Sequence, residues 1–61
     1  MFARHIVVVE DDSLLRDLIA TSLESVGYRC ATAATAADAK RICDQIQPDG
    51  VVVDVELGPG P

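Results

Sequence analysis

The chain has 61 residues, so it holds one small domain at most, and its net charge is −5. It carries no basic patch that would neutralise the phosphates of a nucleic acid or of an anionic membrane. No apolar stretch approaches the roughly 20 residues of a membrane span, and the first residues do not resemble a secretory signal. Cys30 and Cys43 lack the spacing of a zinc site, and free thiols without an export signal indicate a cytoplasmic protein.

The first predicted elements are a buried strand and an amphipathic helix. Residues 5–9 are continuously apolar and rich in β-branched side chains, which is typical of a strand covered on both faces. Asp12 or Ser13 can cap the helix that follows. Gly27 stands where a helix C-terminus favours positive φ. Helical spacing predicts that the apolar residues of this helix face the core, namely Leu14, Leu15, Leu18, Ile19, Leu23 and Val26. Its polar residues are expected to point elsewhere, namely Arg16, Asp17, Thr21 and Glu24.

The second half of the chain repeats this alternation. Residues 28–33 predict a weaker, partly polar strand, and Thr35 with Asp38 resembles a capping box for a second helix. The apolar face of that helix consists of Ala39, Ile42, Cys43 and Ile46, and Pro48 and Gly50 end the helix. A strongly apolar strand is predicted at 51–55, and Gly58–Pro61 form a terminal turn.

The order β-α-β-α-β predicts an α/β fold with a parallel sheet and right-handed crossovers. The half-polar second strand suits an edge better than the centre, so we expect strand order 2-1-3. This order sends the two helices to opposite faces of the sheet. Ligands of such sheets bind beyond the carboxyl ends of the strands where the order reverses, which here lies between the first and third strands.

Acidic residues gather at that expected crevice. Glu10 and Asp11 follow the first apolar run, and Asp54 follows Val51-Val52-Val53. Carboxylates brought so close repel one another unless a cation is present, and Mg²⁺ prefers such oxygen ligands. Asp54 is the natural acceptor for an aspartyl-phosphate, Glu10 and Asp11 are the natural metal anchors, and the backbone carbonyl of Glu56 can supply another oxygen.

These residues resemble the receiver domain of two-component response regulators. The similarity is carried by residues 6–12 (IVVVEDD), by Gly27-Tyr28 and by residues 48–57 (PDGVVVDVEL), and it covers essentially the whole chain. It implies a flavodoxin-like fold in which Glu10 and Asp11 bind Mg²⁺, Asp54 accepts the phosphoryl group and the main chain of Glu56 contacts the metal. It also implies that a histidine kinase or a histidine phosphotransfer protein is the donor.

The chain also departs from that family. A whole receiver is about twice as long, and its later strands supply a Ser or Thr and a Lys that contact the phosphoryl group. Neither strand is present, and Lys40 lies mid-helix. We therefore expect residues 1–61 to be the front half of a receiver, with an incomplete output and an uncovered third strand open to pairing with another chain.

Simpler interpretations stand beside these roles. Asp12 is most simply an N-cap, Asp49 a turn residue and His5 an edge histidine. Arg16 and Arg41 are most simply helix-surface charges, although the resemblance to receivers implies that the position of Arg16 can lie near the docking face for the partner. Glu10, Asp11 and Asp54 would then be solvated acids that end strands. The alternative function is a receiver-like interaction module that associates through its exposed sheet edge without phosphotransfer. A nucleotide-binding domain is disfavoured, because acids replace the glycines that such a site needs after the first strand.

Overall fold

The computed structural model describes residues 4–53, in which strands and helices alternate. The predicted second strand begins one residue later than expected, and the third begins one residue earlier. Residues 54 and 55 of the third predicted strand, and the turn predicted at the C-terminus, lie outside the described residues. In chain order the elements are β1 (His5–Val9), α1 (Ser13–Ser25), β2 (Arg29–Ala33), α2 (Ala36–Ile46) and β3 (Gly50–Val53).

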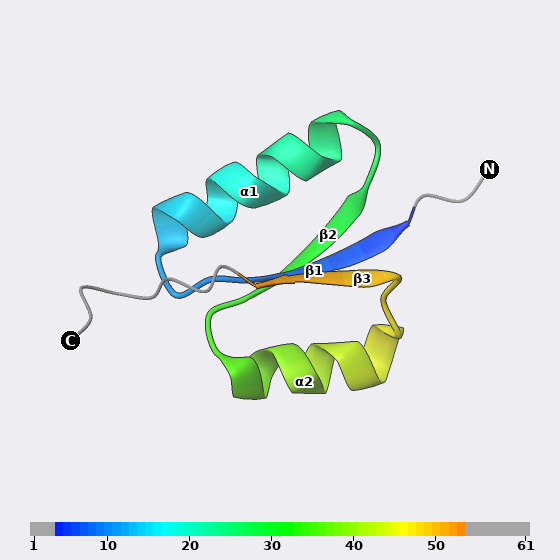
Figure 1. Cartoon of the computed structure of the whole chain (residues 1–61). Coiled ribbons are helices and arrows are strands. Elements are labelled where there is room, and N and C mark those ends of the chain that lie inside the picture. Colours follow the sequence, from blue (N-terminus) through cyan, green and yellow to red (C-terminus); the bar gives the residue numbers. More distant parts are fainter. Residues whose placement is uncertain (1–3, 54–61) are drawn as a thin grey trace.

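The three strands form one parallel sheet in the order β2-β1-β3. Val9 is the register partner of Ala33 on one side and of Val53 on the other. Figure 1 shows α1 on one face of the sheet and α2 on the opposite face. The predicted α/β class, the strand order and the placement of the helices are therefore confirmed.

The core lies on both sides of β1. Val7 and Val8 are fully buried, and successive strand residues point to opposite faces. Val7 packs with Ala33 and with Ala39 of α2, so Val8 faces the α1 side, where Ala20 is buried. A strand buried on both faces explains why the sequence at 6–9 is a continuous apolar run.

The third strand is the least protected element. Both helices contact β1 and β2, but neither contacts β3 within residues 4–53. Val51, Val52 and Val53 are 48%, 36% and 54% exposed. Within the described part of the chain, the uncovered edge predicted for the third strand is present.

Helix α1 is capped at both ends by its own sequence. The Asp12 Oδ1 atom accepts hydrogen bonds from the amides of Leu14 and Leu15, so Asp12 rather than Ser13 is the N-cap. At the other end Gly27 adopts φ +103°. Its amide donates to the Glu24 carbonyl, and the Tyr28 amide donates to the Leu23 carbonyl, which is the Schellman arrangement.

The buried face of α1 differs from the predicted one. Leu14 and Leu18 are 71% and 57% exposed, whereas Ala20 is buried and Arg16 is half-buried. The apolar stripe is broader than the surface that β1 and β2 offer, and the helix turns Leu15, Ile19 and Leu23 towards the sheet. The prediction that Arg16 points away from the sheet as a surface charge was wrong.

Helix α2 keeps one half of the predicted capping box. The Thr35 Oγ1 atom accepts from the Asp38 amide at 3.1 Å. The Asp38 carboxylate instead accepts from the Arg41 guanidinium at 2.8 Å on the exposed face of the helix. The helix ends at Ile46, and Gln47 takes a left-handed φ of 50° before Pro48.

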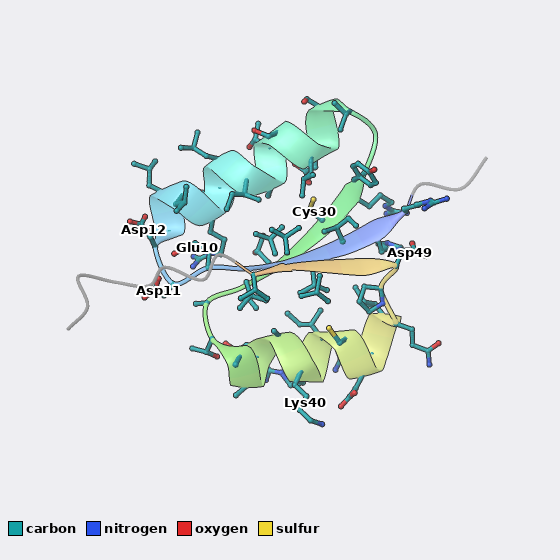
Figure 2. All side chains as sticks on the ribbon, viewed as in Figure 1. Glu10, Asp11, Asp12, Cys30, Lys40 and Asp49 are labelled. Carbon is teal, nitrogen blue, oxygen red and sulfur yellow. The ribbon has the colours of Figure 1, made fainter. Side chains whose placement is uncertain are left out.

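Asp49 does more than form a turn. Its carboxylate accepts from the His5 amide, and its own amide donates to the His5 carbonyl, both at 2.8 Å. These two bonds join the start of β3 to the start of β1. They lie at the end of the sheet opposite to the acidic residues (Figure 2).

Substituting Val7 tests where the core lies. Val7→Ala is expected to lower the free energy of unfolding by about 2 kcal/mol, because two buried methyl groups are lost and a cavity remains. The register partner Val51 is the matched control, since it is a valine on the neighbouring strand that is 48% exposed. Equal losses for Val7→Ala and Val51→Ala in urea unfolding would contradict this description.

Substituting Asp12 tests the cap of α1. Asp12→Ala is expected to cost about 1 kcal/mol, because the amides of Leu14 and Leu15 lose their acceptor. Asp12→Asn keeps a side-chain oxygen and is expected to retain most of that stability. Thermal unfolding of both variants measures the difference, and an Asn variant as unstable as the Ala variant would rule out capping as the cause.

Candidate functional site

Three acidic residues lie together at the carboxyl end of β1, in the turn that leads into α1. Figure 2 shows Glu10, Asp11 and Asp12 at this end of the sheet. We call residues 10–12 the acid turn. Their environments differ sharply, because Glu10 is buried while Asp11 and Asp12 are exposed. The three carboxylates are therefore suited to different tasks.

Glu10 is held by three hydrogen bonds. Its amide donates to the Ala33 carbonyl at 3.0 Å, and its carbonyl accepts from the Arg16 Nη1 atom at 2.9 Å. Its Oε2 atom accepts from the Asp12 amide at 2.9 Å. The side chain is thus folded back over the acid turn rather than extended into solvent, and Glu10 is only 3% exposed.

The second carboxylate oxygen of Glu10 has no such partner. Oε1 is buried and accepts no hydrogen bond from any of residues 4–53. A buried carboxylate oxygen without a donor is costly, and a bound cation would remove that cost. This orphaned atom is the feature of the acid turn that fits a metal ion.

The carboxylates of Asp11 and Asp12 differ in whether hydrogen bonds already engage them. Asp12 is engaged as the cap of α1, which confirms the interpretation that the sequence favoured for it. Asp11 is exposed and forms no side-chain hydrogen bond to another described residue. Its carboxylate is therefore available as a ligand. Hard oxygen donors of this kind suit Mg²⁺, which commonly binds through one or two carboxylates.

The other predicted site residues, Asp54 and Glu56, lie outside the described residues. The structure does describe β1 and β3 up to Val53, the residue before Asp54. β1 and β3 are parallel neighbours, and Val9 pairs with Val53. Glu10 and Asp54 are the residues that follow these two partners in the sequence. Within residues 4–53, no three His, Cys, Asp or Glu side chains gather closely enough to hold a metal ion.

The remaining reactive side chains lie away from the acid turn. Lys40 projects from the outer side of α2 (Figure 2), where its ammonium lies 3.6 Å from the Asp44 carboxylate. Cys30 is half-buried between β2 and α1, and its thiol donates to the Ala20 carbonyl at 3.7 Å. Burial and the nearby Glu24 carboxylate raise the pKa of the Cys30 thiol, so this cysteine is a poor nucleophile near neutral pH.

Arg16 is the residue of this site that the sequence analysis missed. It was treated as a surface charge, but its guanidinium reaches back six residues to the Glu10 carbonyl. The available signal was Ala20, which lies one helical turn after Arg16 and is buried. Counting Ala20 among the core residues of α1 would have placed Arg16 beside the sheet.

None of the helices found between residues 4 and 53 has the length and apolar character that crossing a membrane requires.

Comparison with known proteins agrees with the geometry of the sheet and the acid turn. Residues 6–60 match the family model of the response regulator receiver domain. The chain is 38% identical over 52 residues to the transcriptional regulatory protein AfsQ1 of Streptomyces coelicolor, covering 85% of the chain and 23% of that protein. It is 41% identical over 54 residues to the adventurous-gliding motility protein Z of Myxococcus xanthus, covering 88% of the chain and 4% of that protein.

A third relative is the phosphate regulon transcriptional regulatory protein PhoB of Pseudomonas aeruginosa, which is 32% identical over 54 residues. This alignment covers 88% of the chain and 24% of the relative. The chain therefore spans less than a quarter of the length of each of these three proteins. No solved structure matches the chain at the same level of significance.

The family match takes in nearly the whole sequence, and the parallel sheet ordered β2-β1-β3 is the arrangement expected for that family. The chain belongs to the receiver domain family of response regulators.

Proposed function

We propose that the chain is the phosphoacceptor of a two-component phosphorelay, and that Asp54 receives the phosphoryl group. Glu10, Asp11 and Asp54 would bind Mg²⁺ through their carboxylates, with the main-chain carbonyl of Glu56 as a further ligand. In this role the chain is an acceptor domain rather than an enzyme that turns over a separate substrate.

The observation that supports this role most directly is the pairing of β1 with β3. The two strands run parallel, and Val9 and Val53 are register partners. Each is followed in the sequence by an acidic residue. The buried and unpartnered Oε1 atom of Glu10 gives independent support, because it is an oxygen ligand without a hydrogen-bond donor among the described residues.

The transfer itself is a displacement at phosphorus. A carboxylate oxygen of Asp54 forms the new P–O bond while the P–N bond to the donor imidazole breaks, and the electron pair of that bond stays on the imidazole nitrogen. When bound, Mg²⁺ offsets the negative charge that develops on the transferring oxygens. The task of this chain is to hold the acceptor and the two acids that follow β1 in place.

Receiver domains interact with histidine kinases or histidine phosphotransfer proteins, and we propose a partner of that class here. We also propose a cytoplasmic location. Cys30 and Cys43 lie on opposite faces of the sheet and are not bridged, which suits a reducing compartment. The relatives have names from transcription and from gliding motility, so we assign no output to this chain.

Phosphorylation by a small phosphodonor tests the role of Asp54. With Mg²⁺ and such a donor, intact-protein mass spectrometry is expected to show the addition of one phosphoryl group. The addition is expected to disappear in Asp54→Asn, because the amide is not a nucleophile, and to fall strongly when the metal is chelated. Asp44→Asn is the matched control, since Asp44 is exposed on α2 and its carboxylate lies beside Lys40. A phosphoryl group that persists in Asp54→Asn would defeat the assignment.

A second candidate function is favoured by the exposure of β3. This strand pairs only with β1 among the described elements, and its valines are uncovered. An open strand of this kind can pair with a strand of another chain. The chain would then act as an interaction module that associates through this edge without phosphotransfer.

Sedimentation measures this association. If β3 is the contact, the average mass should rise with protein concentration, and Val52→Lys should reduce that rise, because a lysine charge disfavours edge pairing. Leu18→Lys on the exposed side of α1 is the control for added charge. A mass that stays monomeric at all concentrations would exclude this second candidate.

A further inference from the structure

Arg16 occupies an unusual position for a charged residue. It lies in the first turns of α1, yet it is half-buried, whereas Arg4, Arg29 and Arg41 are exposed. Its amide donates to the Asp12 carbonyl at 2.8 Å, and its guanidinium donates to the Glu10 carbonyl at 2.9 Å. One residue of the helix thus holds both ends of the acid turn.

The contact with Glu10 completes the restraint of that residue. The amide of Glu10 is fixed by β2 through the Ala33 carbonyl, and Oε2 is fixed by the Asp12 amide. The carbonyl of Glu10 receives its side-chain hydrogen bond from Arg16. These contacts leave Oε1 as the one oxygen of Glu10 without a partner among residues 4–53.

We propose that Arg16 is a positioning residue for the acid turn, and that its hydrogen bond to the Glu10 carbonyl sets the direction of Glu10 Oε1 and of the neighbouring Asp11 carboxylate. This role deepens the proposed phosphoacceptor function and depends on it where Mg²⁺ binding is concerned. In this role Arg16 is not itself a ligand of the metal. It acts through the backbone of Glu10, as partners behind a metal ligand commonly do.

Charge and positioning predict opposite effects when Arg16 is replaced. A guanidinium near the acid turn repels a divalent cation, so an effect of charge alone would make Mg²⁺ bind more tightly once the guanidinium is removed. Loss of positioning makes Mg²⁺ bind more weakly, because the Glu10 carbonyl loses its donor and the turn is free to move. The sign of the change in affinity therefore separates the two.

Titration calorimetry with Mg²⁺ measures that sign. Arg16→Gln is expected to weaken Mg²⁺ binding by about tenfold, which is the usual loss when a residue behind a metal ligand is removed. Arg16→Lys keeps the charge but not the planar fork of donors, and its affinity is expected to fall between those of Arg16→Gln and the unaltered chain. Arg29→Gln removes the same charge from an exposed residue at the far end of the sheet, and it is expected to leave the affinity unchanged.

Two outcomes of this titration would overturn the positioning role. The first is Arg16→Gln binding Mg²⁺ as tightly as the unaltered chain or more tightly. The second is Arg16→Lys binding as tightly as the unaltered chain, which would mean that the guanidinium contact with the Glu10 carbonyl is not needed. If Arg16→Gln does not fold, Arg16→Lys decides the question on this second criterion.

Amide hydrogen exchange without metal tests Arg16 independently of Mg²⁺. The Asp12 amide, which donates to Glu10 Oε2, is expected to exchange faster in Arg16→Gln and at an unchanged rate in Arg29→Gln. Rates for Val7 and Val8, which lie in the core, report global opening and serve as the reference. An unaltered chain that binds no Mg²⁺ would count against the proposed function, whereas Asp12 exchange that is the same in Arg16→Gln would count against the role of Arg16.

Discussion

β1 forms backbone hydrogen bonds along both of its edges, and helices cover both of its faces. No other described strand is enclosed in this way. The enclosure requires an apolar sequence from Ile6 to Val9, and this apolar sequence ends where the enclosure ends. The acid turn begins at that point because Glu10 is the first residue after the enclosed run, and its amide still pairs with β2. The residues of the core and those of the candidate site are thus consecutive in the sequence.

The acid turn is more ordered than a run of three acids would be in isolation. Each acid has a distinct environment: Glu10 is tied by its backbone and by one carboxylate oxygen, Asp12 caps α1, and Asp11 remains exposed. Mutual repulsion among carboxylates opposes such an arrangement. Hydrogen bonds from the amides of Asp12, Leu14 and Leu15 reduce the repulsion by stabilising two of the three negative charges. The oxygen left without a donor is then a specific one, Glu10 Oε1.

Much of the fold could be predicted because local patterns and tertiary packing agree. The apolar run at 5–9 predicted a central strand, the half-polar run at 28–33 predicted an edge, and Gly27 predicted the end of the first helix. The rotation of α1 could not be predicted in the same way. Its apolar residues span more than one face, so spacing alone does not show that Ala20 packs against the sheet while Leu14 and Leu18 remain exposed. Arg16 was misjudged for the same reason. For the candidate site, the sequence predicted where Glu10 and Asp11 lie, while the contribution of Asp54 and Glu56 remains a proposal.

The paired bonds between His5 and Asp49 have a consequence for the opposite end of the sheet. They pin the first residues of β1 and β3 to each other, and from that anchor each strand extends without a bulge to Val9 and Val53. A slip by one residue would displace the end of β3 by about 3.3 Å relative to the end of β1 and turn its side chains to the other face. The contact between Asp49 and His5 therefore sets the register of β1 and β3. The relative position of the carboxyl ends of β1 and β3 thus depends on a contact at the other end of the sheet, which takes no part in the proposed chemistry.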